Sequence, residues 1–185
     1  DIGLVLASLE FDTSSGFSPD IVHVAGAVFA VAYEGALSDG FLKTFTIAED
    51  GTLSAVLDTV EFDTTQGQGC AIIKVAATVF LLAYSRGATI ELQSRTISAD
   101  GVIGVAALDT LQIDANTTNV PGQMSLINIS GDVFAVAHST STDVGAGVGG
   151  GVVRTFTCDS LGAIGAAQID SLAFDTLGTT EGPTI

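Results

Sequence analysis

Short and almost wholly apolar stretches recur along this chain at regular intervals. The hexamer VFAVAY at residues 28–33 returns as VFLLAY at residues 79–84 and as VFAVAH at residues 133–138. A continuous apolar run of this length is typical of a strand that is covered on both faces. We therefore expect each hexamer to form a buried strand, with small alanines that let neighbouring sheets approach closely.

The segments around the hexamers repeat as well. EFDT at residues 61–64 echoes EFDT at residues 10–13, and TFTIAEDG at residues 44–51 is answered by SRTISADG at residues 94–101 and TFTCDSLG at residues 155–162. Self-similarity with a period of about 50 residues is typical of propellers and other repeat arrays. The chain is therefore expected to be built from structural repeats.

Each repeat carries the signals of four strands. A β-branched run precedes the hexamer, an alternating segment with a tight turn follows it, and a second alternating segment completes the repeat. No segment holds a helical period. We predict an all-β protein, a β-propeller-like array of four-stranded antiparallel blades, with three complete blades and partial ones at both ends. The expected units are residues 1–10, the last strand of a preceding blade; residues 11–61, 62–112 and 113–173, three blades, the third with a long loop at 139–151; and residues 174–185, the start of a further blade.

One family resemblance rests on the segment VFAVAYEG and the later DGFLKTFTIAEDGTL. It resembles the short repeats of bacterial and archaeal β-propeller surface proteins, over essentially the whole chain. The resemblance implies a propeller or a propeller-like stack of blades and carries no catalytic residues. An integrin-type calcium-loop repeat is rejected because LSDG and AEDG do not supply a DxDxDG loop, and a WD repeat is rejected because the chain has no Trp.

Charge and hydropathy exclude two classes of partner. The chain has 21 acidic and 5 basic residues, for a net charge of −16. Such a surface repels phosphate backbones and anionic membranes, so we expect no nucleic-acid binding. The apolar runs are far shorter than the roughly 18 residues of a membrane helix, so we expect no membrane insertion. The chain begins at Asp1 without a methionine, and we expect it to be processed or partial.

The two cysteines lie in different repeats at non-equivalent positions. Cys158 occupies the position that Ile47 and Ile97 fill in the other repeats. We interpret Cys158 as a small buried apolar residue and do not expect a disulfide with Cys70. No Cys/His cluster or redox motif is present, so we predict neither a metal site nor a cofactor.

Two sets of equivalent polar side chains are the candidate ligand-binding residues. The first set lies on the first strand of each repeat, which lines the central channel of a propeller: His23, Lys74 and Asn128. The second set ends the second strand of each repeat: Tyr33, Tyr84 and His138. The alternative for both sets is structural, as solvation of a channel wall or of a strand end. Since no partners of a His-based catalyst are evident, no catalytic residue is predicted.

Aspartates also recur at equivalent positions, and their repetition favours an architectural role. An Asp at a junction can accept hydrogen bonds from the backbone of its own turn. One set lies at the junctions between repeats: Asp12, Asp63, Asp114 and Asp175. The other set shortly precedes it: Asp58, Asp109 and Asp170.

Two further features mark the third repeat. Sequons for N-linked glycans occur at Asn116 and Asn128, of which Asn128 falls inside an expected strand, where a sugar is harder to place. The segment STSTDVGAGVGGG lengthens the third repeat and is rich in Gly. Because repeat proteins often bind partners through loops that break the repeat, this loop is a candidate for specificity; a tolerated surface insertion is the alternative.

Together these observations predict a non-enzymatic, extracellular or cell-surface protein with a structural or adhesive role. Three blades and a fraction leave strand edges bare, so the expected partners are further copies of the chain, including head-to-tail association into a filament, or glycans and other surface proteins. A ligand- or glycan-binding propeller domain of a larger surface protein is one alternative. A propeller-fold lyase or glycosidase is the other.

Overall fold

The structure is a computed structural model that describes residues 4–115, 122, 124–140 and 150–175. It contains three four-stranded antiparallel sheets, and within the described residues the remaining regular element is a short 3-10 turn at Ala36–Ser38. The predicted all-β, propeller-like array of four-stranded blades is confirmed. The strands of the first sheet are β1 (Phe17–Ala25), β2 (Val28–Glu34), β3 (Gly40–Thr46) and β4 (Asp58–Asp63); those of the second are β5 (Gln68–Lys74), β6 (Val79–Arg86), β7 (Thr89–Thr96) and β8 (Asp109–Ala115); those of the third are β9 (Ser125–Ser130), β10 (Val133–Thr140), β11 (Gly150–Thr157) and β12 (Asp170–Asp175).

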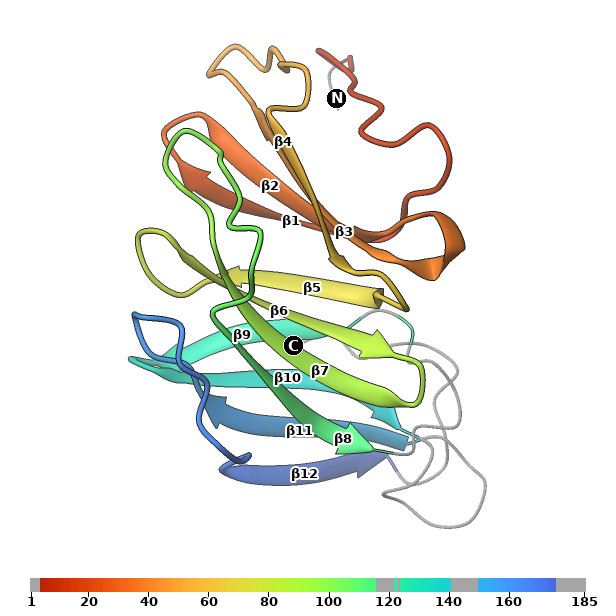
Figure 1. Ribbon diagram of the computed structural model, residues 1–185, viewed down its shortest axis with the longest axis vertical. Helices are drawn as coiled ribbons and strands as arrows, with labels where there is room; N and C mark the ends of the chain where they lie inside the picture. Colours follow the sequence, from red (N-terminus) through yellow and green to blue (C-terminus); the bar gives the residue numbers. More distant parts are fainter. Residues whose placement is uncertain (1–3, 116–121, 123, 141–149, 176–185) are drawn as a thin grey trace.

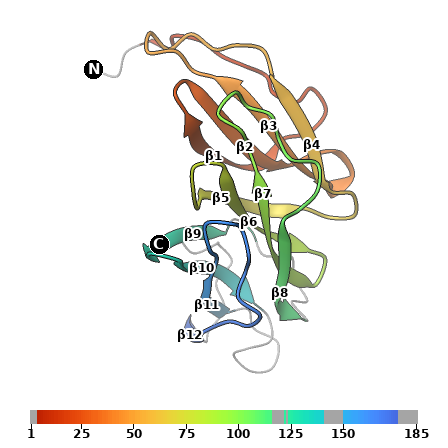
Figure 2. The ribbon, with the colours of Figure 1, turned by 60° about the vertical axis from the view of Figure 1, so that its left-hand side comes forward.

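Each sheet is a meander in which sequential strands are neighbours. The three sheets follow one another face to face along the long axis of the molecule (Figure 1). Their first strands, β1, β5 and β9, lie next to one another, and β4 and β8 lie at the opposite edge (Figure 2). This is the arrangement of consecutive propeller blades, in which the first strand is innermost.

The apolar hexamers form β2, β6 and β10, the second strand of each sheet, as expected. Phe80 and Phe134 are fully buried between sheets, whereas Phe29 is only half-buried on the outer face of the first sheet. The alanines at the equivalent positions Ala32, Ala83 and Ala137 are all buried. Burying one Phe side chain stabilises the fold by about 1.5–3 kcal/mol, so the two inter-sheet Phe residues anchor the stack.

A glycine turn between the third and fourth strands seats each sheet against the one before it. Gly101 and Gly162 both adopt φ of +92°, a left-handed conformation that other residues rarely take. Each glycine lies directly under a leucine of the preceding sheet, Leu57 in one case and Leu108 in the other. A side chain at either glycine would collide with that leucine, so the turn needs glycine for its conformation and for space.

Hydrogen bonds between sheets repeat at equivalent positions. The hydroxyl of Thr44 donates to the Gly101 carbonyl at 2.6 Å, and the Asp58 carboxylate accepts the Ile103 N–H at 2.8 Å. In the next interface Asp109 accepts the N–H of Ile164 at 2.8 Å. The architectural role expected for this set of aspartates is confirmed, although the hydrogen bonds reach the following sheet as well as the local turn.

The cysteine thiols are both free and buried. Cys158 belongs to the apolar cluster between the second and third sheets, and it pairs with Ile164 as Ile97 pairs with Ile103. Its interpretation as a buried apolar residue is therefore confirmed. Burial raises the pKa of the Cys158 thiol to about 11.

Residues 4–10 were expected to form a strand, but they run as irregular chain. A strand requires a neighbouring strand for its backbone hydrogen bonds, and the described residues place none beside this segment. Leu6 nevertheless lies against Gly51 just as Leu57 lies against Gly101. The segment thus occupies the place of a preceding blade's last strand without its conformation, and the predicted domain boundaries stay predictions.

In the described part of the chain, no helix is long and apolar enough to cross a membrane.

Candidate functional site

An aspartate and a tyrosine meet at the start of the first and of the second sheet. Asp12 accepts a hydrogen bond from the Tyr33 hydroxyl at 2.7 Å, and Asp63 accepts one from Tyr84 at 3.3 Å. The phenylalanine before each aspartate packs edge-on against the same tyrosine, with ring centroids 4.9 Å and 5.0 Å apart. The EFDT motif therefore places its Phe and Asp on the tyrosine that ends the next hexamer.

Each aspartate also organises its own turn. Asp12 accepts backbone N–H groups from Ser14 and Ser15. Asp63 accepts those of Thr65 and Gln66 in the same way. The predicted architectural role of the junction aspartates is confirmed for these two; the side chains of Asp114 and Asp175 lie outside the described part of the chain.

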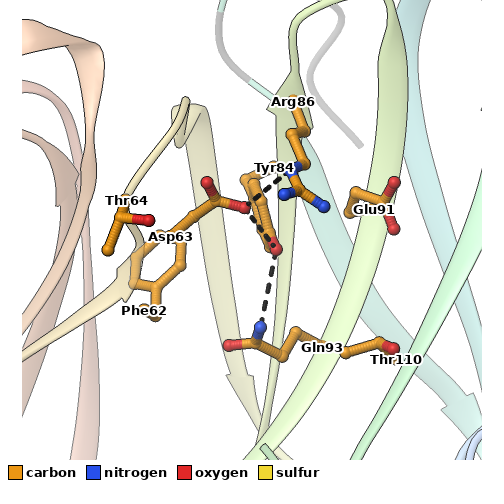
Figure 3. Close-up of a pocket in the computed structure, with 8 residues that line it drawn as sticks. All are labelled: Phe62, Asp63, Thr64, Tyr84, Arg86, Glu91, Gln93 and Thr110. Carbon is orange, nitrogen blue, oxygen red and sulfur yellow. Dashed lines mark hydrogen bonds and ion pairs between the residues drawn. The ribbon is translucent and has the colours of Figure 1, made fainter.

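In the second sheet this junction opens into a pocket of about 270 Å³. Figure 3 shows the side chains that line it, which come from the end of β4 and from β6, β7 and β8. Arg86 forms an ion pair with Asp63, with 3.3 Å between Nε and the carboxylate oxygen. The side chain of Arg86 is 51% exposed and that of Asp63 only 6%, so a fixed carboxylate holds an accessible guanidinium. The lining residues are Phe62, Asp63, Thr64, Tyr84, Arg86, Glu91, Gln93 and Thr110.

A chain of hydrogen bonds fixes the floor of the pocket. Arg95, which is buried, donates from Nε to Gln93 at 2.6 Å and from Nη1 to two backbone carbonyls. Gln93 donates in turn to the Tyr84 hydroxyl at 3.5 Å. Tyr84 is thus held between Gln93 and Asp63 (Figure 3). Burial, and then the Asp63 charge, raise the pKa of Tyr84, so its hydroxyl stays protonated at neutral pH.

Glu91 is the second carboxylate of the pocket. Burial raises the pKa of the Glu91 carboxyl above its ordinary value, and the neighbouring Asp63 charge adds to this. The Thr89 hydroxyl at 3.2 Å and the Arg86 charge act in the opposite direction and favour the ionised form. Asp63 has four partners, two of them backbone N–H groups, whereas Glu91 accepts a hydrogen bond from the Thr89 hydroxyl and lines the pocket. Glu91 is therefore the carboxylate better suited to exchange a proton with a bound molecule.

Arg86, Glu91 and Gln93 were not among the residues singled out from the sequence. A signal was available, because they break the repeat. Where the second sheet pairs Tyr84 with Glu91, the first pairs Tyr33 with Phe41 and the third pairs His138 with Val152. A charged residue at a position that is apolar in the other repeats marks a local function more directly than a residue shared by all three.

The candidate residues on the first strands, His23, Lys74 and Asn128, all contact backbone carbonyls. His23 contacts the Gly26 carbonyl through Nε2 at 2.8 Å, and Asn128 donates to the Gly131 carbonyl at 2.8 Å. Lys74 donates to the Val24 carbonyl of the first sheet and lies over the Phe80 ring. These contacts account for the three side chains structurally, and a ligand-binding role for them stays a prediction.

The candidate residues that end the second strands, Tyr33, Tyr84 and His138, lie in three different environments. Tyr33 is buried among Phe11, Phe41 and Lys43, and burial, followed by the Asp12 hydrogen bond, raises its pKa. His138 is buried, and its Nδ1 lies 3.1 Å from the Ser139 carbonyl. Tyr84 is the member of the set that lines the pocket of Figure 3. The ligand-binding prediction thus remains open for this set, with Tyr84 the best placed.

The two features of the third repeat are only partly visible. Asn128 is exposed on β9, where the amide nitrogen that would carry a glycan donates to the Gly131 carbonyl, and its glycosylation stays a prediction. The sequon at Asn116 and most of the loop at 139–151 fall outside the described residues. Across the described residues, no group of three or more His, Cys, Asp or Glu side chains is arranged to hold a metal ion.

In chemical terms, the pocket is lined by a carboxylate with a raised pKa, Glu91, and by a guanidinium, Arg86, that is held in place by Asp63. A carboxylate with a raised pKa can take a proton from water or return one to a leaving group. A guanidinium beside it can stabilise negative charge that develops on an oxygen. The pocket can therefore support acid–base chemistry at a C–O bond.

Comparison with known proteins supports the fold. No protein-family model matches the chain, and no curated protein matches it. Among solved structures, it is similar to the crystal structure of a "putative 6-phosphogluconolactonase" from Bacteroides fragilis, with a TM-score of 0.61 and 16% sequence identity. The similarity covers 87% of this chain and 40% of the other. At this identity the likeness shows a shared propeller-like fold.

This finding corrects the functional prediction made from the sequence. A non-enzymatic structural or adhesive protein that self-associates, including as a filament, was expected from the repeats alone. The similar fold belongs to a protein named as an enzyme, so these repeats are no argument for a structural role. Of the alternatives raised from the sequence, the propeller-fold lyase or glycosidase agrees better with this finding, although the similar protein is named as a lactonase.

Proposed function

We propose that this chain is part of a propeller-fold enzyme that hydrolyses a C–O bond in a sugar-derived substrate, such as a sugar lactone. One observation carries the proposal: Glu91 and Arg86, which break the repeat, meet in one pocket on a fold shared with a protein named as a lactonase. The fold likeness alone would not carry it, because one fold serves many functions.

Glu91 acts in this proposal as the general base. Its carboxylate accepts a proton from a water molecule as the water attacks the carbonyl carbon of the lactone. Glu91 then returns this proton to the ring oxygen as the bond between the carbonyl carbon and that oxygen breaks. A carboxylate whose pKa is raised by burial is a stronger base than an ordinary carboxylate. General-base catalysis of this kind contributes about 10²–10⁴-fold to the rate.

Arg86 stabilises the negative charge that develops on the lactone carbonyl oxygen. Its Nε is occupied by Asp63, and Figure 3 shows the guanidinium extending toward the space between Tyr84 and Glu91. Because Asp63 is fixed by the backbone of its own turn, the guanidinium is oriented before the substrate arrives. Phe62 and Tyr84 add aromatic surface against which a sugar ring can pack.

The charges of the pocket favour an unphosphorylated substrate. Arg86 is the one strongly exposed cation among the basic residues, all of which lie in the described ranges. Lys43 is 14% exposed and bound to Asp12, while Arg95 and Arg154 are buried. A phosphate in the pocket would therefore meet two carboxylates and a single guanidinium, and like charges at short range repel.

The test is a comparison of hydrolysis rates for a neutral sugar lactone and for its 6-phosphorylated form. We expect measurable hydrolysis of the neutral lactone above the Glu91→Gln background, and a lower kcat/KM for the phosphorylated one. Preference for the phosphorylated lactone would contradict the substrate class while leaving the reaction in place. Equal rates for wild type and Glu91→Gln on both lactones would contradict the reaction itself.

The predictions of an extracellular or cell-surface location, of the surface-protein type of repeat, and of glycans, surface proteins or further copies as partners are untested. The proposed reaction does not depend on any of them.

A further inference from the structure

Arg95 is a buried cation at a position that is apolar in the other two sheets. Where β7 carries Arg95, the first sheet carries Phe45 and the third carries Phe156. The residue is 4% exposed, and within the described residues no carboxylate forms an ion pair with it. Burial lowers the pKa of the guanidinium, because a buried cation loses its solvation. A buried charge without a carboxylate partner costs free energy, so packing does not account for an arginine here.

The guanidinium binds neutral acceptors on three segments next to the pocket. Its Nη1 donates to the carbonyls of Gly104 and Val105, between β7 and β8, at 2.9 Å and 2.6 Å. Its Nη2 donates at 3.4 Å to the carbonyl of Phe62, which lines the pocket. Its Nε donates at 2.6 Å to Oε1 of Gln93, another lining residue. Arg95 therefore joins the end of β4 to β7, two of the elements that form the pocket.

The contact between Arg95 and Gln93 determines which way round the amide lies. A guanidinium carries donors alone, so the amide must turn its carbonyl oxygen to Arg95 and its –NH₂ group away from it. That –NH₂ group donates to the Tyr84 hydroxyl at 3.5 Å. The hydroxyl accepts this bond and directs its own proton to Asp63, at 3.3 Å. The donors thus run in one direction from Arg95 to the carboxylate that pairs with Arg86 (Figure 3).

We propose that Arg95 is a positioning residue, which fixes the orientation of the Gln93 amide and so the direction of the hydrogen bonds that hold Tyr84 and Asp63. With the amide reversed, Gln93 would accept the Tyr84 proton, and Asp63 would lose this donor. Asp63 and the Arg86 guanidinium bound to it would then be held less firmly. The orientation of Gln93 is a structural property, and its effect on hydrolysis rests on the proposed function.

Nuclear Overhauser effects in the isotope-labelled protein report the orientation of the amide directly. The Gln93 side-chain resonance is identified by its absence from Gln93→Met. In the wild type, the Gln93 –NH₂ protons should show a cross-peak to the ring protons of Tyr84 that flank the hydroxyl. In Arg95→Met the amide has no donor to fix its carbonyl end, so the cross-peak should lose most of its intensity.

Kinetics on the neutral sugar lactone then measure the consequence for the reaction. Arg95→Met and Gln93→Met should each lower kcat by about 10- to 100-fold and change KM by less than about threefold, because a misplaced guanidinium affects the transition state most. The double variant should be no slower than Gln93→Met alone, because Arg95 acts through Gln93. The matched control is Arg154→Met. Arg154 is a buried arginine of β11 that donates to Gln168 at 2.7 Å, away from the pocket, and kcat should stay within about twofold.

Urea unfolding shows which variants fold. Gln93→Met leaves the carbonyl contacts of Arg95 in place, so it tests the same chain of hydrogen bonds if Arg95→Met does not fold. A cross-peak that is absent from the wild type, or unchanged in Arg95→Met, would overturn the proposal. So would wild-type kcat in Gln93→Met, or a double variant that is slower than Gln93→Met by the full factor of Arg95→Met. If the wild type does not hydrolyse the lactone, the proposed function fails, and the cross-peaks alone decide whether Arg95 orients Gln93.

Discussion

The first and second sheets carry the same junction motif, but the site is closed in the first sheet and open in the second. In both, a Phe-Asp pair meets the tyrosine that ends the hexamer strand. In the first sheet the site is closed: Phe41 stacks on Tyr33 with centroids 5.8 Å apart, and Lys43 lies over the same ring. In the second sheet Glu91 and Gln93 stand in those places, and the site is an open pocket.

The residue two positions after the tyrosine shows how the difference arises. Gly35 in the first sheet lies against the ring of Phe41, where an added Cβ would fall 2.3 Å from a ring carbon. The equivalent residue in the second sheet is Arg86, whose side chain has room because Glu91 replaces the phenylalanine. Two linked substitutions therefore distinguish the packed junction from the one that holds titratable groups; the connection between the two strands also differs, with a 3-10 turn at Ala36–Ser38 in the first sheet and a shorter turn in the second.

The sharpest way to break this comparison is to rebuild the second junction as the first. Arg86→Gly, Glu91→Phe and Gln93→Lys together remove the proposed base and guanidinium and fill the pocket with an apolar ring; Arg86→Gly is included because an added Cβ at the equivalent Gly35 would lie 2.3 Å from the Phe41 ring. We expect lactone hydrolysis to fall at least about 10²–10³-fold, measured as kcat/KM, while the free energy of unfolding by urea does not fall by more than about 1 kcal/mol. A variant that keeps its activity would place the reaction elsewhere.

Removal of the junction aspartate should lower the free energy of unfolding at both junctions, and more so at the junction of the second sheet. Asp63→Ala leaves two backbone N–H groups, the Tyr84 hydroxyl and Arg86 without their acceptor, at a cost of about 2–4 kcal/mol. Asp12→Ala is the matched control on a more accessible turn, with an expected loss of about 1–2 kcal/mol. Urea unfolding of both variants measures the difference. Equal losses would show that burial of the junction does not set its strength.

Removal of the tyrosine hydroxyls should have the opposite order of effects, with the larger loss of stability in the first sheet. Tyr33→Phe removes a 2.7 Å hydrogen bond to Asp12, whereas Tyr84→Phe removes one of 3.3 Å. Hydrogen bonds to charged groups contribute about 1.5–3 kcal/mol when well formed, so Tyr33→Phe should cost about 1.5 kcal/mol and Tyr84→Phe about 0.5 kcal/mol. A larger loss for Tyr84→Phe in thermal unfolding would reverse the assignment of the closed and open sites.

The smallest expected effect is a change in the free energy of unfolding at acidic pH. The Tyr33 hydrogen bond, followed by those from Ser14, holds the pKa of Asp12 well below its ordinary 3.8. Because the folded pKa lies below the unfolded one, this contribution to stability is present above about pH 5 and is lost as the pH falls through the folded pKa. The difference in unfolding free energy between wild type and Asp12→Asn should therefore shrink between about pH 5 and pH 2. A difference that stays constant over this range would show that the pKa of Asp12 is not lowered by folding.

The architecture could be predicted from the sequence because it depends on repetition. Phe80, Phe134 and the alanines of the hexamers recur at fixed spacing, and apolar periodicity determines which strand is buried. The aspartate turns could be predicted for the same reason, since an Asp accepts hydrogen bonds from N–H groups two and three residues away.

The pocket could not be predicted in this way, because its parts come from different elements. Asp63 ends β4, and Arg86 and Glu91 flank the turn between β6 and β7, so their contact follows from how one sheet lies on the next. Glu91 was not singled out from the sequence for a related reason. Tyr84 could be predicted because the equivalent position carries a ring with a polar group in all three repeats. Glu91 could not be found in this way, because it is a residue by which the second repeat differs from the other two.

The most direct test of this account is the dependence of kcat/KM on pH for hydrolysis of a neutral sugar lactone, with Glu91→Gln beside wild type. The wild-type rate should rise with pH through an apparent pKa above the ordinary 4.5 of a glutamate and then level off, since the base must be ionised. Glu91→Gln should lose this step and about 10²–10⁴-fold of the rate, with its unfolding free energy nearly unchanged. A variant with wild-type rates and an unaltered pH profile would contradict the claim that the second junction is the functional one.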